Sequence, residues 1–179
     1  RAYDPTRLTC GVRRSNSDPA TSFLEDIWTQ NFLDPSANPP NMPVITSEHV
    51  GHGYPVNSFS SEDSLIELIH QHAIRQNLSF GQSKWGGMLG WCAFDYASSH
   101  NNAVANNGNR YVSNHGMMDI FRIPKFAAYF FQSQRDPARY GPMLYICNYW
   151  RPSSPSLIRV VSNCEQVELF VNGVSKGRS

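Results

Sequence analysis

The sequence predicts an α/β fold followed by the first strands of an all-β module. Up to about residue 139, near-continuous apolar runs alternate with helical patterns, which is typical of parallel strands buried on both faces. From about residue 140 the helical spacing stops, and short strand-like runs are separated by turns. We therefore divide the chain into residues 1–139 and residues 140–179, and we expect the second part to be an incomplete domain.

Four strands are expected in the first part. They are the runs at residues 5–12, 25–33, 42–48 and 86–96. The third run is bounded by Pro39-Pro40 before it and by Gly51 after it, and both features interrupt regular structure. It ends on Glu48, a carboxylate at the end of an apolar strand, which taken alone is more often a solvated loop residue than a functional one.

Two helices are expected to alternate with these strands. Residues 62–77 carry apolar side chains at helical spacing, and Ser60 with Asp63 is expected to cap the amino-terminal end. Residues 124–134 form the second helical pattern, in which Pro124 suits the first turn. In the second part, Asn172-Gly173 between two apolar runs predicts a two-residue hairpin.

Composition excludes several classes of protein. The net charge of +1 gives no electrostatic basis for binding nucleic acid or an anionic membrane, and 40% hydrophobic residues are enough for a core. The four cysteines are widely spaced, which argues against a zinc site. Cys10, Cys92 and Cys147 lie in apolar runs and are expected to be buried free thiols. The cellular compartment stays open, with a bacterial periplasmic or extracellular location slightly favoured over the cytoplasm.

Four motifs carry a resemblance to a known family. They are "PVITSEHVGH", "GGMLGWCAFDY", "GMMDIFRIPKFAAYFFQSQRDP" and "SNCEQVELFVNG", and they stand in the order seen in glycoside hydrolase family 2, above all in bacterial β-galactosidases. The resemblance implies a (β/α)8 TIM barrel followed by an immunoglobulin-like β-sandwich. The four expected strands then correspond to barrel strands five to eight, and the all-β module corresponds to the start of the sandwich.

The resemblance also implies roles for residues at the strand ends. Glu48 matches the nucleophile of a retaining glycosidase, at the end of a barrel strand where catalytic groups are found. Trp91 matches the aromatic residue that lines the sugar subsite, with a plain core position as the alternative. Asn31 and Phe32 stand where the family usually has Asn and Tyr, so the tyrosine hydroxyl is missing here.

Three further residues are included as substrate contacts. His49 and His52 are expected to be polar loop residues near the sugar. Together with Glu48 they imitate a metal-binding pattern, but on a loop this spacing does not aim both imidazoles at one ion, so we expect no metal and no cofactor. Asp95 is the third, and orienting a neighbour or capping the following loop are the alternatives for it.

We therefore expect a fragment of a retaining, exo-acting glycoside hydrolase, most consistent with a β-galactosidase. The family's acid/base glutamate lies upstream in an Asn-Glu pair, and this sequence has no Asn-Glu. The chain by itself should be inactive, and its partners should be a carbohydrate and the amino-terminal half of the barrel. The Asn-x-Lys motif of β-glucuronidases is missing, which favours a galactoside while mannosides and polysaccharide ends stay open. The alternative is a non-catalytic carbohydrate-binding or interaction module that uses Trp91.

Overall fold

The computed structural model of the protein describes residues 4–13, 25–32, 41–50, 61–97 and 112–179. Its main element is a four-stranded sheet built from β1 (Val12–Arg13), β2 (Trp28–Asn31), β3 (Val44–His49) and β4 (Trp85–Gly90). The strands lie in the order β1-β2-β3-β4, and each neighbouring pair is parallel. The expected parallel arrangement is therefore confirmed, and the carboxyl ends of all four strands meet at one edge.

Three of the strands are clearly shorter than expected, and β2 covers only Trp28–Asn31 of the run at residues 25–33. β1 has two residues, so most of the run at residues 5–12 lies outside the sheet. β4 ends at Gly90, although the apolar run continues to residue 96. Beyond it, β5 (Tyr96–Ala97) pairs antiparallel with β6 (Val112–Ser113), and Phe94 forms a bridge with Met118. The apolar residues after Gly90 are thus held by a second segment of the chain rather than by the sheet.

The helices begin close to where they were expected, with two corrections at their ends. α1 (Glu62–Ser79) is capped by Ser61, whose side chain accepts a hydrogen bond from the Ser64 N–H, so the prediction of Ser60 as the cap was wrong by one residue. α2 (Phe126–Ser133) begins after Lys125, and Pro124 therefore lies before the helix rather than in its first turn. A short helix, α3 (Pro137–Tyr140), was not predicted; the Asp136 carboxylate caps it by accepting from the Ala138 N–H.

The second part of the chain consists of paired strands. β7 (Leu144–Ile146) pairs antiparallel with β8 (Val160–Ser162), and β9 (Glu168–Val171) forms a hairpin with β10 (Val174–Arg178). At the hairpin turn, φ is 51° at Asn172 and 78° at Gly173. A two-residue turn matching the twist of the strands needs positive φ at both positions, so the predicted hairpin is confirmed.

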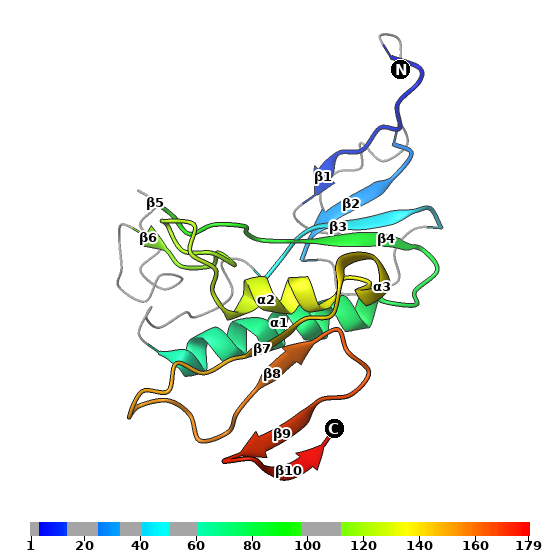
Figure 1. Ribbon diagram of the computed structural model, residues 1–179. Helices are drawn as coiled ribbons and strands as arrows, with labels where there is room; N and C mark the ends of the chain where they lie inside the picture. Colours follow the sequence, from blue (N-terminus) through cyan, green and yellow to red (C-terminus); the bar gives the residue numbers. More distant parts are fainter. Residues whose placement is uncertain (1–3, 14–24, 33–40, 51–60, 98–111) are drawn as a thin grey trace.

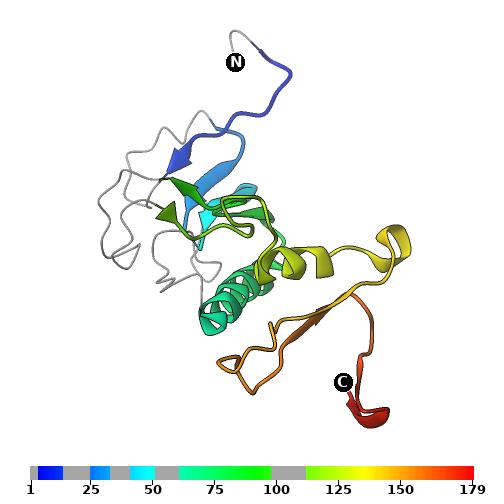
Figure 2. The same ribbon diagram turned by 60° about the vertical axis from the view of Figure 1, so that its left-hand side comes forward.

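The helices lie between the parallel sheet and the β7–β8 pair (Figures 1 and 2). On the sheet side, Leu68 of α1 and Ala127 of α2 are buried with Met117 and Val50 packed against them. On the other side, Leu65, Phe126 and Cys147 form a second buried cluster, and the rings of Tyr129 and Tyr145 stack 3.6 Å apart. The first and second parts of the chain therefore share a core across the two helices.

The four cysteines differ in their burial. All four cysteines are free thiols, and Cys147 is buried as expected, whereas Cys92 is half-buried and Cys10 is exposed. Cys10 precedes β1 and is not covered by another element, so its predicted burial was wrong. None of the helices among the described residues has the length and apolar character to cross a membrane.

Candidate active site

The carboxyl ends of three parallel strands bring the main predicted residues together. Asn31 is the last residue of β2, Glu48 is the penultimate residue of β3, and Trp91 directly follows β4. Asn31 and Glu48 are partners across the β2–β3 pair. The Trp91 N–H donates to the carbonyl oxygen of His49 at 2.9 Å, which ties the end of β4 to the end of β3.

β3 carries one extra residue at this edge, between Thr46 and His49. Against β2, the step from Gln30 to Asn31 is matched by the two-residue step from Thr46 to Glu48. Against β4, a two-residue step is matched by the three-residue step from Thr46 to His49. The pairing of β3 with β2 and its pairing with β4 therefore show the same β-bulge. Such bulges change the direction of side chains and are common next to active sites.

Glu48 has a defined hydrogen-bonded environment. The Asn31 amide Nδ2 donates to the Glu48 Oε2 at 2.8 Å, and the Ser47 hydroxyl donates to the Asn31 Oδ1 at 2.9 Å. All three side chains are half-buried. Because an amide N–H favours a charged carboxylate over a neutral one, the arrangement suits a carboxylate that works in its ionised form.

The backbone turns sharply just after both strands that carry these residues. Phe32 follows β2 with φ of 55°, and Val50 follows β3 with φ of 58°. The left-handed region is unfavourable for side chains of this bulk and is found mostly where the surroundings enforce it, often at functional sites. The Phe32 N–H donates to the Glu48 carbonyl oxygen at 2.6 Å, which holds this turn against β3. The Phe32 ring is 46% exposed beside the site.

Trp91 lies at the surface of the site rather than in the core. Its side chain is 36% exposed, and its indole Nε1 donates to the Tyr96 hydroxyl at 3.3 Å. The rings of Trp91 and Tyr96 meet edge to face with centroids 6.0 Å apart. The indole is therefore fixed in orientation and still partly exposed, as a stacking surface for a ligand requires.

His49 is not the loop residue that the sequence suggested, because it is the last residue of β3 and is 1% exposed. Its ring faces α1, where the Nε2 lies 3.2 Å from the Gln76 Nε2 and the ring centroid lies 5.2 Å from that of His72. Burial lowers the pKa of His49 to about 4 and that of His72 to about 3. Two neutral histidines therefore pack against each other between β3 and α1. The other predicted histidine, His52, lies outside the described residues.

Asp95 is buried in an ion pair instead of facing open space. Its Oδ1 accepts from the Lys125 Nζ at 2.8 Å and from the Gly116 N–H at 2.8 Å, and the same ammonium donates to the carbonyl oxygen of Asn114 at 3.0 Å. Burial raises the pKa of the Asp95 carboxyl, and the Lys125 charge opposes that rise. These contacts fasten the segment after Trp91 to the start of α2, and they support the orienting role among the alternatives for Asp95.

Cys92 directly follows Trp91 at this edge, and its thiol is held in the protonated form. Burial raises the pKa of the Cys92 thiol to about 11, and its sulfur donates to the Phe94 carbonyl oxygen at 3.1 Å. The protonated thiol is a poor nucleophile at neutral pH. Within the part of the chain that the structure describes, no three His, Cys, Asp or Glu side chains are grouped so as to hold a metal ion.

Comparisons with known proteins match the chain over almost its whole length. The curated β-galactosidase of Thermoanaerobacter pseudethanolicus is 38% identical across 94% of this chain, and that of Thermoanaerobacterium thermosulfurigenes is 36% identical across 97%. These relatives support the resemblance to a fragment of a glycoside hydrolase family 2 enzyme. The chain spans about a quarter of the length of these relatives, 23% and 26% respectively.

Solved structures show that this chain has the fold of part of two bacterial enzymes. Bacteroides uniformis β-glucuronidase 2, covalently bound to cyclophellitol-6-carboxylate aziridine, matches 99% of this chain with a TM-score of 0.75 and 20% identity, and the match covers 24% of that enzyme. Bacteroides uniformis β-glucuronidase 3 matches 98% of this chain with a TM-score of 0.66 and 23% identity, and 26% of that enzyme is covered. Residues 155–179 match a family described as a domain of unknown function, DUF4982.

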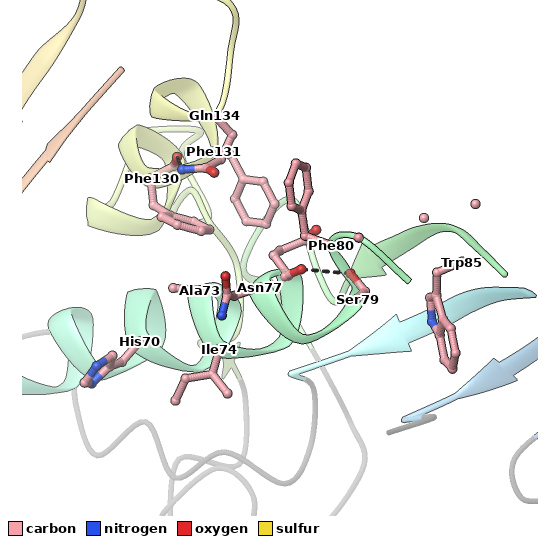
Figure 3. A pocket seen from close by; sticks show the side chains of 14 residues that line it. His70, Ala73, Ile74, Asn77, Ser79, Phe80, Trp85, Phe130, Phe131 and Gln134 are labelled. Atoms are coloured by element: carbon pink, nitrogen blue, oxygen red, sulfur yellow. Dashed lines mark hydrogen bonds between the residues drawn. The ribbon is translucent and has the colours of Figure 1, made fainter. Parts of the chain in front are cut away.

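A hollow of this chain lies apart from the Glu48 site. It has a volume of about 960 Å³ and lies between the carboxyl-terminal half of α1, α2 and the start of β4 (Figure 3). Phe130 and Phe131 of α2 stand on one side of it, and Ile74 and Asn77 of α1 stand on the other. None of its lining residues is a predicted site residue, and it opens near the amino-terminal end of β4, whereas Glu48 is at the carboxyl end of β3.

Sequence reasoning missed the residues that support the site. Ser47, Gln76, His72 and Lys125 each contact a predicted residue through a side chain. Gln76 and Lys125 lie 27 and 30 positions from their partners, so no local pattern pairs them. Ser47 could have been noticed in the sequence, because it interrupts the apolar run directly before Glu48. Its contact with Asn31, however, follows only from the register of the strands.

Proposed function

We propose that the complete protein is a retaining, exo-acting β-galactosidase in which Glu48 is the nucleophile. The observation that carries the proposal is the half-buried Glu48 carboxylate at the carboxyl end of a parallel strand, with an amide N–H donor 2.8 Å from its Oε2. The two curated relatives named above are β-galactosidases, which supports the galactoside as substrate. Residues 1–139 would then supply strands five to eight of a TIM barrel, and residues 140–179 the first strands of an immunoglobulin-like sandwich.

The reaction needs two carboxyl groups with different tasks. The ionised Glu48 attacks the anomeric carbon, the bond to the leaving-group oxygen breaks, and a carboxylic acid elsewhere in the protein protonates that oxygen. A covalent glycosyl-enzyme on Glu48 results, and water activated by the same second carboxylate then releases the sugar. The Asn31 N–H stabilises the charged Glu48 before the attack, and Trp91 offers a face for the apolar side of the pyranose.

Replacing Glu48 tests the proposal. In the complete polypeptide, Glu48→Gln should lower kcat for an aryl β-galactoside by several orders of magnitude, because an amide does not attack the anomeric carbon. Binding of galactose should be largely kept, since the side chain hardly changes in size. Glu67→Gln is the matched control, because Glu67 is an exposed carboxylate on α1. An unchanged kcat in Glu48→Gln would exclude Glu48 as nucleophile.

Comparing the wild type with Glu48→Gln also tests the alternative, a non-catalytic carbohydrate-binding module. A non-catalytic carbohydrate-binding module would bind galactosides without turnover in both the wild type and the variant. An aryl β-glucuronide and an aryl β-mannoside, tested beside the galactoside, decide the sugar. A higher kcat/KM for either of them would replace the galactoside in the proposal and leave the role of Glu48 in place.

A further inference from the structure

The β-bulge in β3 places two neighbouring side chains on one face of the sheet. In a regular strand, successive side chains point to opposite faces, so Ser47 and Glu48 would be separated by the sheet. Here Val44, Thr46 and His49 are buried, and the consecutive Ser47 and Glu48 are both half-buried. Their side chains also both contact one residue of β2, Asn31.

The contacts of Asn31 are directional. Its Oδ1 can only accept a hydrogen bond and its Nδ2 can only donate, so the two ends of the amide are not equivalent. The Ser47 hydroxyl donates to the Oδ1, and this leaves the Nδ2 directed at the Glu48 Oε2. If the amide turned over, the Oδ1 would face the carboxylate and two acceptors would meet without a proton. The acceptor-only carboxylate therefore selects this orientation of the amide, and the serine hydroxyl holds the amide in it by donating to the Oδ1.

We propose that Ser47 is a positioning residue that acts on Glu48 through Asn31, and that the extra residue in β3 exists to bring these three side chains together. The inference rests on the proposed role of Glu48 as nucleophile. Ser47 touches neither the sugar nor the reacting atoms in this scheme. It keeps the amide donor on the carboxylate, which favours the ionised nucleophile and fixes its direction of attack.

The sharpest test is a double-mutant cycle in the complete polypeptide. Ser47→Ala should lower kcat/KM for an aryl β-galactoside roughly three- to tenfold, the typical value of one net hydrogen bond. It should also move the acid limb of the pH profile to higher pH, because the charged carboxylate loses support. In an Asn31→Ala background the same Ser47→Ala change should have no further effect, since Ser47 acts only through the amide.

Additivity would overturn the inference. If Ser47→Ala costs the same factor with and without Asn31, or leaves the acid limb where it was, Ser47 does not act through the amide. Ser83→Ala is the matched control, because Ser83 is exposed before β4, at the other end of the sheet, and should change neither quantity. Unchanged thermal unfolding of the Ser47→Ala protein shows that its fold is kept.

The two proposals can fail separately. If Glu48→Gln keeps its activity, the nucleophile is another residue and the role of Ser47 falls with it. If Glu48→Gln is inactive and the cycle is additive, the role of Glu48 stands and only that of Ser47 is excluded.

Discussion

In the proposed active site, Glu48 and Trp91 would have different physical tasks at the carboxyl edge of the sheet. The carboxylate is held by a polar contact to Asn31, whereas the indole is held by its ring edge and Nε1 and keeps part of its surface exposed. A charged group that must react gains from a directed donor. An apolar face that must bind and release a sugar gains from fixed orientation without a covering side chain.

Removing the indole should therefore weaken sugar binding more than it changes the chemistry. Trp91→Ala is expected to raise the inhibition constant of galactose roughly 30-fold, which corresponds to about 2 kcal/mol of lost apolar contact. Trp91→Phe should recover part of this loss. Trp150→Ala is the control, because Trp150 is a 69% exposed tryptophan in the loop between β7 and β8. An unchanged inhibition constant in Trp91→Ala would remove Trp91 from the sugar subsite.

The sequence indicated the residues that face the site more readily than those that hold them. Glu48 could be found because a carboxylate ends an apolar run, and Trp91 because an indole follows one. His49 was misjudged, because the glycine-rich residues after it suggested that the loop had already begun. Asp95 could not be placed, because its partner Lys125 is brought to it by the pairing of residues 92–95 with residues 116–118.

At the scale of elements, β3 and α1 share a buried histidine pair. His72 on α1 contacts His49 on β3 and Phe131 on α2 through its ring edges, and a side chain at Gly90 would come within 3.0 Å of the His72 ring. Neither nitrogen of His72 has a hydrogen-bond partner among the described residues. A positive charge at this junction would be unpaired and dry, so the packing of α1 on the sheet favours neutral histidines.

This packing predicts a loss of stability in mild acid. Both pKa values lie below the ordinary value of 6.5, at about 4 for His49 and about 3 for His72. Below pH 6.5 the unfolded chain binds more protons than the folded one. The stabilisation from the two neutral histidines is therefore complete above pH 6.5, and it is lost as the pH falls from 6.5 toward their folded-state pKa values. The melting temperature of His72→Leu should therefore fall less between pH 7 and pH 4.5 than that of the wild type.

A matched variant on the same helix separates this effect from a general loss of histidine. His70 lies two residues earlier on α1 with a side chain that is 58% exposed. His70→Leu should keep the wild-type dependence of the melting temperature on pH, as followed by calorimetry. Equal slopes for His72→Leu and the wild type would show that the histidine pair does not drive the acid sensitivity.

Strand and helix order could be predicted from apolar spacing, but their ends depended on tertiary contacts. β4 was expected to continue to residue 96 because apolar residues continue, yet Met117 and Met118 pair with Cys92 and Ala93 instead. The bulge in β3 has no sequence signal of its own. It is visible only when β2 and β4 are both aligned with β3.

At the scale of the whole molecule, the described residues form one edge of the proposed active site. The four parallel strands run in sequential order, as neighbouring strands of a barrel do, and Val12 and Leu89 are large apolar side chains that are 66% and 60% exposed on β1 and β4. These exposed apolar side chains support the proposal that further strands of the complete polypeptide cover them. In the proposed reaction, the second carboxyl group would lie elsewhere in the complete polypeptide.

The most direct measurement is to trap the covalent intermediate on the complete protein. A 2-deoxy-2-fluoro-β-galactoside with a good leaving group should inactivate the enzyme. The fluorine slows both the formation and the hydrolysis of the glycosyl-enzyme, whereas the good leaving group speeds only its formation, so the intermediate accumulates. Mass spectrometry of the digested protein should then find one fluorosugar on the peptide that contains Glu48. A sugar on any other carboxylate, or inactivation without a covalent adduct, would contradict the assignment of Glu48 as the nucleophile.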